Sequence, residues 1–303
     1  MNNFRRKIDY KDNGEYIRPL KRVIAIASQK GGVGKSTTAI NVSAYLSHFG
    51  YKTIIIDLDP QSNSTKGLGI DYSKINYSVY NALVSNDNPN KIILDTSYDN
   101  LKILPASWKL SDAEAELNPL NGKEFRLRDT IEKIEVDYDY IIIDCSPHLG
   151  LLIINALAAA EEVIIPMQCE YYALEGVGRL IEIIDLVKIN FNERLRVAGA
   201  VLTMYSNTRL AMQTIKEIKQ YFYGSVFKTI IPRNVSLGEA TSFCKPIIVY
   251  DPLCKGAVAY RNLTREITGN DYKFIRSGTS ILPRKIRDFW ITGSPPRHAI
   301  KRR

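Results

Sequence analysis

A glycine-rich segment near the start of the chain contains the residue types that bind phosphate groups. It follows a short apolar run and reads Lys30-Gly31-Gly32-Val33-Gly34-Lys35-Ser36-Thr37. Glycines let backbone N–H groups converge on an anion, and the N-terminus of a following helix adds a favourable dipole. We expect the Lys35 ammonium to reach the β- and γ-phosphates of a nucleotide and the Ser36 hydroxyl to ligate Mg²⁺. The pattern G-x-x-x-x-G-K-[ST] is not met in full, because Gln29 occupies its first glycine position.

Aspartates follow two later apolar runs. Asp57 and Asp59 come at the end of one run, and Asp144 ends another. Alternation along an extended segment puts Asp57 and Asp59 on the same side of the chain. Ligands of open α/β sheets bind beyond the carboxyl ends of the strands, so we expect these aspartates beside Lys35 and Ser36. One of the pair can face the metal and the attacking water, with capping of a turn or helix as the alternative, and Asp144 is expected to hold Mg²⁺ through water.

The apolar runs predict the elements that position these residues. They are continuous rather than alternating, and they fall at 23–27, 53–56, 141–143, 163–165 and 197–202. Continuous β-branched runs are typical of parallel strands buried on both faces, and the helical segments between them supply the crossovers. The sequence therefore predicts an α/β fold with a doubly wound, mostly parallel sheet flanked by helices.

Charge divides the 303-residue chain into a body and two ends. The net charge of +9 is concentrated in residues 1–22, with seven Lys or Arg against three Asp or Glu, and in residues 271–303, with nine against two. We predict a basic, flexible arm at 1–20, one domain at 21–270 and a basic, disordered tail at 271–303. Because the net charge of the body is slightly negative, the basic pI of the whole chain does not by itself predict that the body binds DNA.

The remaining composition excludes several classes of protein. No apolar run approaches the ~18 residues of a membrane span, so we expect a cytoplasmic protein. The four cysteines form no C-x-x-C pair, and the three histidines lie far apart in the sequence. We therefore expect buried thiols rather than a disulfide or a Cys/His metal site.

The glycine-rich segment resembles the K-G-G-x-G-K-[ST]-[ST] signature of the deviant Walker A ATPases, which include ParA, MinD and nitrogenase iron-protein relatives. The resemblance implies ATP hydrolysis with Mg²⁺ in a homodimer that sandwiches the nucleotides, with Lys30 crossing to the second subunit. A second cation beside the transferred phosphate would stabilise charge as an arginine finger does. A solvated loop charge is the alternative for Lys30. The resemblance also implies that Asp59 positions or activates water and that Asp57 has a supporting role near the metal.

Two further segments resemble parts of the same family. The segment 146–150, which begins two residues after Asp144, is similar to the switch that senses the γ-phosphate. The segment 231–235 is similar to the adenine-contacting loop, which implies that Pro232 stacks near the base and that Asn234 reads its edge. Similarity to ParA proteins in particular extends over about residues 20–270.

Resemblance to ParA implies an ATP-bound dimer that binds DNA without sequence preference on the nucleoid, and a ParB-like centromere-binding partner that stimulates hydrolysis. The segment 207–222 offers a candidate DNA face. At ~100° per residue its apolar side is formed by Ala211, Ile215, Ile218 and Phe222. Roughly opposite lie Arg209, Lys216 and Lys219. This basic stripe could neutralise phosphates, and an ordinary solvated helix face is the alternative.

Two other members of the superfamily give alternative functions. A MinD-like positioning ATPase would need a terminal amphipathic helix, which prolines at 283, 295 and 296 interrupt. Membrane association is therefore not favoured. A nitrogenase-reductase-like electron carrier would need cysteines placed to hold an iron–sulfur cluster between subunits, and only Cys145 lies near the right region.

Overall fold

In this computed structural model, residues 21–170, 177–222 and 225–269 are described. They form a seven-stranded sheet in the order β3-β4-β2-β5-β1-β6-β7, in which only the β3–β4 pair is antiparallel. The strands are β1 (Arg22–Ile26), β2 (Thr53–Leu58), β3 (Leu94–Asp95), β4 (Leu101–Leu104), β5 (Tyr140–Cys145), β6 (Glu162–Gln168) and β7 (Arg196–Thr203). This arrangement confirms the predicted doubly wound, mostly parallel sheet.

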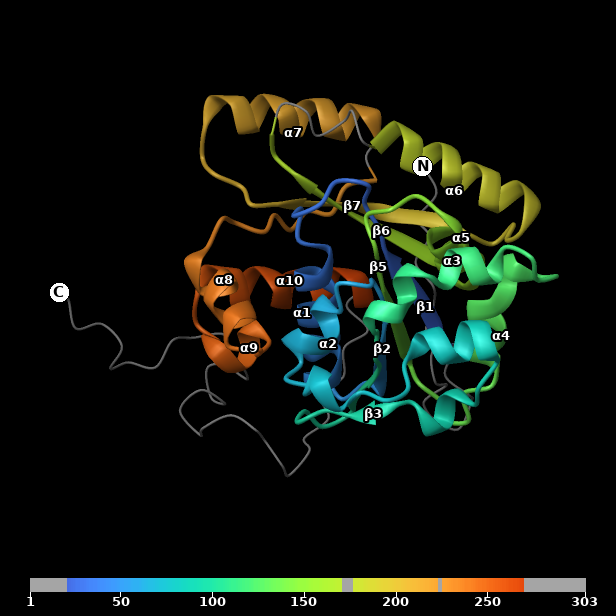
Figure 1. Cartoon of the computed structure of the whole chain (residues 1–303). Helices are drawn as coiled ribbons and strands as arrows, with labels where there is room; N and C mark the ends of the chain where they lie inside the picture. Colours follow the sequence, from blue (N-terminus) through green and yellow to red (C-terminus); the bar gives the residue numbers. More distant parts are fainter. Residues whose placement is uncertain (1–20, 171–176, 223–224, 270–303) are drawn as a thin grey trace, which may run out of the picture.

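Helices cover both faces of this sheet. They are α1 (Lys35–His48), α2 (Asn63–Gly67), α3 (Ala113–Leu117), α4 (Arg126–Glu132), α5 (Leu151–Ala159), α6 (Val177–Asn190), α7 (Arg209–Tyr221), α8 (Val235–Ser242), α9 (Ile247–Tyr250) and α10 (Lys255–Thr268). Figure 1 shows α1, α8 and α9 on one side of the sheet and α3, α4 and α5 on the other.

Successive strand residues point into two separate cores, which explains the continuous apolar runs. Val23 and Ala25 of β1 pack in the core beneath α4, α5 and α6, whereas Ile24 and Ile26 pack in the core beneath α1 and α10. Every residue of β2 and of β5 is buried. A strand that is covered on both faces gains from apolar side chains at every position, so its pattern loses the alternation of a half-exposed strand.

The amino edge of the sheet is fastened by one buried carboxylate. Glu162, the first residue of β6, bonds Arg22 Nη2 and Arg196 Nη2 at 2.6 Å each, and both arginines begin neighbouring strands. Arg22 Nη1 also donates to the carbonyl of Ile267 in the last turn of α10. Burial by itself raises the pKa of Glu162, but the hydrogen bonds and charge of Arg22 and Arg196 outweigh it and hold that pKa below its usual value.

Several predictions about segments can now be compared with the structure. The five predicted strands are confirmed with bounds shifted by up to three residues, but the sequence did not reveal β3 or β4. The predicted arm at 1–20 and the predicted tail at 271–303 both lie outside the described residues. The prediction of buried thiols holds for Cys145 and Cys169, whereas Cys254 is only partly buried and Cys244 is exposed in the turn after α8.

Candidate nucleotide-binding site

The glycine-rich loop joins β1 to α1 at the carboxyl edge of the sheet. Gly32 and Gly34 have φ values of 73° and 90°, in the left-handed region that L side chains rarely adopt. Lys35 is the first residue of α1, so the loop delivers the chain directly into the amino end of a 14-residue helix. Backbone N–H groups and a helix dipole thus meet at one point, as an anion site requires.

The ends of β6 and β7 hold this loop in place. Thr203 Oγ1 lies 2.9 Å from the carbonyl oxygen of Val33, and Gln168 Nε2 donates to the carbonyl of Gly32 over 3.2 Å. Thr203 is 2% exposed and closes β7. The loop is therefore fixed from the sheet even though two of its glycines have wide conformational freedom.

Lys35 is the buried cation of the site. Its side chain is turned back under the loop, where Nζ donates to the carbonyl of Lys30 over 3.1 Å. Burial lowers the pKa of Lys35, and the negative charges of Asp144 and Asp59 oppose that shift. A polyphosphate would add further negative charge to the same space and would favour the ammonium form.

Asp144 ends β5 next to the loop and has one oxygen without a protein partner. Oδ2 accepts from Ser64 Oγ at 2.7 Å, and the hydrogen bond from Ser36 favours its charged form. Oδ1 is buried and makes no hydrogen bond within the described structure. Burial raises the pKa of Asp144, and the hydrogen bonds from Ser64 and Ser36 and the charge of Lys35 oppose that shift only in part. A cation would satisfy the orphaned oxygen.

These residues fit Mg²⁺ bound together with a nucleotide. The free oxygen of Asp144 and the hydroxyl of Ser36 are hard oxygen ligands, and Mg²⁺ normally takes only one or two protein ligands beside phosphates and waters. In the described ranges no three His, Cys, Asp or Glu side chains gather to hold a metal by themselves. The site is thus suited to a metal that arrives with its substrate.

Asp57 lies beside Asp144 across the β2–β5 pair, but its oxygens are already used. Oδ2 accepts from the backbone N–H and from Oγ1 of Thr65, at 2.8 and 2.7 Å, and Oδ1 accepts from the N–H of Asp59 at 3.2 Å. Burial, together with the nearby charge of Asp144, raises the pKa of Asp57. The donors that engage Asp57 thus lie in the loop after β2 and in α2, and its supporting role near the metal stays a prediction.

Asp59 is the carboxylate of that loop. It is 5% exposed, and its Oδ1 accepts the N–H of Gln61 at 2.9 Å. Ser62, three residues on, has a φ of 55°, so the chain turns sharply into α2. Hydrogen bonds from the protein engage one oxygen of Asp59 within the described part of the chain, which leaves the other for a water molecule.

Lys30 lies on the rim of the site rather than beneath the loop. Its Nζ donates to Gln168 Oε1 at 3.1 Å and to Glu170 Oε2 at 3.2 Å, and the side chain is 44% exposed. Glu170 Oε1 also lies 3.9 Å from Arg233 Nη2. The two lysines of the loop therefore have different surroundings, one enclosed with carboxylates and one half exposed.

The predicted base-contacting loop is attached to the end of β7. The N–H of Tyr205 donates to the carbonyl of Ile231 at 3.0 Å, and the N–H of Arg233 donates to that of Tyr205 at 2.9 Å. Pro232 is the bridge partner of Tyr205, which brings it to the same edge as Thr203. Asn234 precedes α8, makes no capping bond, and has a buried Oδ1 without a partner in the described structure.

The predicted helix at 207–222 exists as α7. Ala211, Ile218 and Phe222 are buried, and Ile215 packs against the same core, so the apolar face is confirmed. Arg209, Lys216 and Lys219 are all exposed. Figure 1 shows α7 on the outside of the molecule beside β7, at the end of the sheet farthest from β3.

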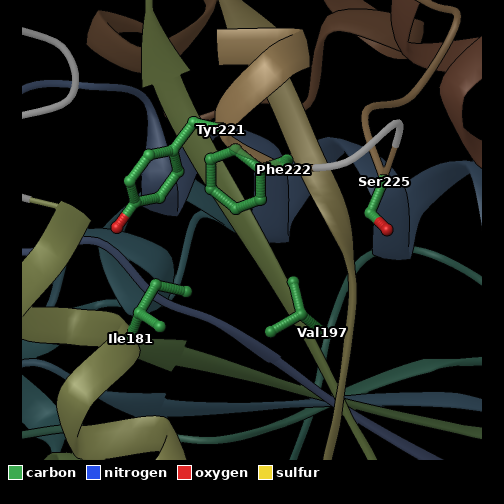
Figure 2. A pocket seen from close by; sticks show the side chains of 5 residues that line it. All are labelled: Ile181, Val197, Tyr221, Phe222 and Ser225. Atoms are coloured by element: carbon green, nitrogen blue, oxygen red, sulfur yellow. The ribbon is translucent and has the colours of Figure 1, made fainter.

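An apolar pocket of about 440 Å³ lies away from this site. Ile181, Val197, Tyr221, Phe222 and Ser225 line it, and Figure 2 shows their side chains around it. Val197 is near the start of β7, whereas the phosphate loop contacts Thr203 at the other end of that strand. The pocket therefore takes no part in the arrangement described above.

Some residues of this site were not found from the sequence. Ser64, Thr65 and Thr203 contact the predicted residues through hydroxyl groups, and such residues are too common to be singled out in one sequence. Gln168 and Glu170 lie in a stretch whose similarity to ParA proteins was visible, but their contacts with Lys30 depend on the distance between strand ends.

Comparison with known proteins identifies the family. A model described as an AAA domain matches residues 21–197. The sporulation initiation inhibitor protein Soj of Bacillus subtilis is 48% identical over 250 residues, which cover 82% of this chain and 99% of that protein. The chain belongs to the ParA/Soj family of partitioning ATPases. The chromosome partitioning protein ParA of Myxococcus xanthus is also 48% identical, over 82% of this chain and 89% of that protein.

Solved structures agree with this family assignment. Cobyrinic acid a,c-diamide synthase from Mycobacterium smegmatis, crystallised with an ATP analogue and magnesium, is 33% identical and superimposes with a TM-score of 0.75. The match covers 86% of this chain and 100% of that one. The fold of this ParA/Soj family member is thus that of a P-loop nucleotide-binding protein, and ATP with Mg²⁺ is its expected ligand pair. No helix among the described residues has both the length and the apolar character needed to cross a bilayer.

Proposed function

We propose that this protein is an ATP-driven dimerisation switch that segregates DNA. As a member of the ParA/Soj family it is an ATPase that uses ATP and Mg²⁺. The observation that carries the proposal is the contrast between two lysines of one loop. Lys35 is 6% exposed, next to the charges of Asp144 and Asp59, whereas the side chain of Lys30 is 44% exposed on the rim. One cation suits the chain's own nucleotide and the other suits a nucleotide held by a second copy.

Within one subunit, the catalytic groups divide into binding and hydrolysis. The loop from Gly31 to Thr37 and the Lys35 ammonium bind the phosphates, while Ser36 and Asp144 hold Mg²⁺, which neutralises phosphate charge when bound. Asp59 orients the attacking water with its unengaged oxygen, and Asp57 supports the Asp59 loop. Pro232 and Asn234 contact adenine, and the unpartnered Oδ1 of Asn234 suits an amino-group donor.

In the ATP-bound homodimer, Lys30 leaves Glu170 and reaches the phosphates of the partner subunit. The change costs little, because an exposed ion pair contributes only about 0–1 kcal/mol. A polyphosphate with Mg²⁺ in a closed interface offers a stronger field than one half-exposed carboxylate. ATP thus favours the dimer.

The dimer binds DNA without sequence preference through α7. Arg209, Lys216 and Lys219 are exposed on one helix and contact phosphates rather than base edges. A ParB-like centromere-binding protein then stimulates hydrolysis and returns the protein to the monomer. Cycles of this kind place the protein in the cytoplasm, on the nucleoid, and move cargo DNA.

A binding experiment tests this function. The full chain is mixed with a random DNA duplex, or with anionic lipid vesicles, in the presence of Mg²⁺ with ATP, ADP or no nucleotide. DNA binding that requires ATP, with dimerisation measured by light scattering in the same samples, is the expected result. ATP-dependent binding to vesicles and not to DNA would instead support a MinD-like positioning ATPase.

A further inference from the structure

A carboxylate from α3 reaches the amino end of α5. Glu114 Oε1 accepts the backbone N–H of Leu152 at 3.2 Å. Leu152 is the second residue of α5, so its N–H has no acceptor within the helix. A carboxylate at this position satisfies the donor and also interacts favourably with the positive end of the helix dipole.

Glu114 also occupies the space beside Gly150, the residue that precedes α5. A Cβ atom on Gly150 would lie 2.3 Å from both carboxylate oxygens of Glu114. The backbone of Gly150 is extended, with φ −110° and ψ −154°, so an L residue could adopt it without strain. A side chain at this position would therefore have to push the Glu114 carboxylate aside. Glu114 is therefore packed directly on the end of the segment 146–150, which begins two residues after Asp144.

The segment that carries Glu114 contacts the Asp59 loop as well. Eight residues before Glu114, the N–H of Ala106 donates to Thr65 Oγ1 at 3.1 Å. That same hydroxyl donates to Asp57 Oδ2 at 2.7 Å. The segment 105–117 is thus anchored at one end to the chain after β2 and at the other to the chain after β5.

We propose that Glu114 is a positioning residue for ATP hydrolysis. It sets the start of α5 and thereby the path of the segment 146–150, so that Asp144 and Asp59 keep their relative positions around the γ-phosphate. The inference deepens the proposed function and rests on the roles given there to Asp144 and Asp59. Glu114 acts through the backbone of Gly150 and Leu152 and does not contact the nucleotide.

The neighbouring His148 does not explain the position of Glu114. His148 Nε2 lies 3.8 Å from Glu114 Oε2, but the His148 side chain is 76% exposed. An exposed contact of this length contributes little. The short contacts of Glu114 are those with the main chain of Gly150 and Leu152.

Substitutions of Glu114 test the proposal in the full-length protein. Glu114→Ala removes the acceptor, whereas Glu114→Gln keeps an oxygen of the same reach. Glu116→Ala is the matched control, because Glu116 lies on the same helix but its hydrogen bond goes to the hydroxyl of Tyr80. The affinity for ATP, the single-turnover hydrolysis rate and the melting temperature are measured for each.

We expect Glu114→Ala to reduce the hydrolysis rate about tenfold, because the free energy lost with a helix cap corresponds to roughly that factor in a rate. The Kd for ATP should change less than about twofold. Glu114→Gln should recover most of the rate, and Glu116→Ala should retain all of it. An unchanged rate in Glu114→Ala overturns the positioning role and leaves the proposed function standing. An equal fall in the hydrolysis rate of Glu116→Ala also overturns the positioning role, because a general loss of α3 packing would then explain both results. A wild-type protein without ATPase activity overturns both.

Gly150→Ala gives an independent variant if Glu114→Ala folds poorly. The added Cβ would displace the Glu114 carboxylate, so this variant should show the same loss of rate with ATP binding retained. In the double variant Gly150→Ala/Glu114→Ala the clash is absent, and its rate should equal that of Glu114→Ala alone. Multiplicative losses in the double variant would show that the two residues act separately and would overturn the proposal.

Discussion

Lys30 and Glu170 form an ion pair within one subunit, with Nζ 3.2 Å from Oε2. Both side chains are about half exposed, at 44% and 50%. Exposed pairs of this kind contribute about 0–1 kcal/mol, so the pair can hold Lys30 in the monomer without preventing its release. The pair gives the proposed cross-subunit lysine a defined position before a second subunit arrives.

Lys30→Ala should separate nucleotide binding from dimerisation. The side chain contacts Gln168 and Glu170 but none of the residues expected at the phosphates, so ATP should bind the variant with near wild-type affinity. Its partner in the dimer is the other subunit's nucleotide, so the ATP-dependent dimer should be lost. Light scattering with ATP, and titration with a fluorescent ATP analogue, measure the two properties. A normal dimer would remove Lys30 from the interface.

Glu170→Gln is the counterpart of that variant. It removes the charge that holds Lys30 in the monomer but leaves the lysine itself. Because two such pairs are released in each homodimer and each contributes at most about 1 kcal/mol, the dimer should form up to about thirtyfold more readily, and not more. Weaker dimerisation would mean that Glu170 also acts in the ATP-bound state.

Lys35→Ala should abolish ATP binding. Lys35 is the buried cation of the loop, and charge-assisted contacts with phosphate are among the strongest hydrogen bonds in proteins. We expect affinity to fall by about 100-fold or more, as judged by calorimetry. Lys52→Ala is a suitable control, since Lys52 is exposed at the amino edge of β2. Unchanged affinity in Lys35→Ala would refute the assignment of the loop.

Asp59→Ala should bind ATP, dimerise and then stall. Binding depends on the loop and Mg²⁺, whereas hydrolysis needs an oriented water, so the turnover rate should fall about 100-fold or more. The stalled dimer should accumulate on DNA. Multiple-turnover assays measure the rate, with the exposed Asp99→Ala as control. A rate close to wild type would show that another group orients the water.

The sequence predicted the site better than it predicted the edges of the fold. Lys35, Ser36, Asp59 and Asp144 carry their chemistry in their residue types, and the strands that bear them are continuous apolar runs, so their meeting at the carboxyl edge followed from topology alone. Strand β3 has two residues and β4 four, both too short for their periodicity to be recognised.

Contacts between distant segments could not be predicted from one sequence. Glu114 looks like an ordinary acidic residue of a short helix, and its proposed role depends on its position beside Gly150, thirty-six residues later, where an added Cβ would lie 2.3 Å from the carboxylate oxygens. The resemblance to the deviant Walker A ATPases implied a supporting role for Asp57 near the metal. In the structure, the N–H and the hydroxyl of Thr65 both donate to Asp57 Oδ2. These hydrogen bonds depend on the turn at Ser62, which brings Thr65 back toward the end of β2.

Glu162→Gln should destabilise the protein in a pH-dependent way. The carboxylate is 2% exposed between Arg22 and Arg196, and removal of one partner from a buried ionic group costs about 3 kcal/mol. The folded state lowers the pKa of Glu162, so its contribution is present above the unfolded pKa of about 4.3 and is lost as pH falls through the lower folded pKa. The difference in unfolding free energy between wild type and variant should therefore be full at pH 6 and shrink below about pH 4.

Denaturant melts of both proteins between pH 3 and pH 7 measure this difference. Asp95→Asn is the control, because the Asp95–Lys102 pair is exposed at 83% and 42% and should contribute less than about 1 kcal/mol at any pH. A difference for Glu162→Gln that does not change with pH would mean that packing, rather than charge, accounts for the effect.

DNA binding by the ATP-bound dimer should depend steeply on salt and be insensitive to sequence. Each neutralised phosphate contributes about −0.9 to the slope of log K against log salt.

Replacement of Arg209, Lys216 and Lys219 by Ala should flatten that slope and leave ATP affinity intact, since α7 is separate from the phosphate loop. The control replaces three exposed lysines that lie outside α7, Lys91, Lys109 and Lys133, which changes the net charge equally. A chain truncated after Gly269 is assayed in parallel, because residues 271–303 carry nine Lys or Arg and could bind DNA without ATP. If the α7 variant and the control show equal slopes, net charge rather than a local stripe binds the DNA. Equal binding of the truncated chain with ADP and ATP would remove the main support for the proposed switch.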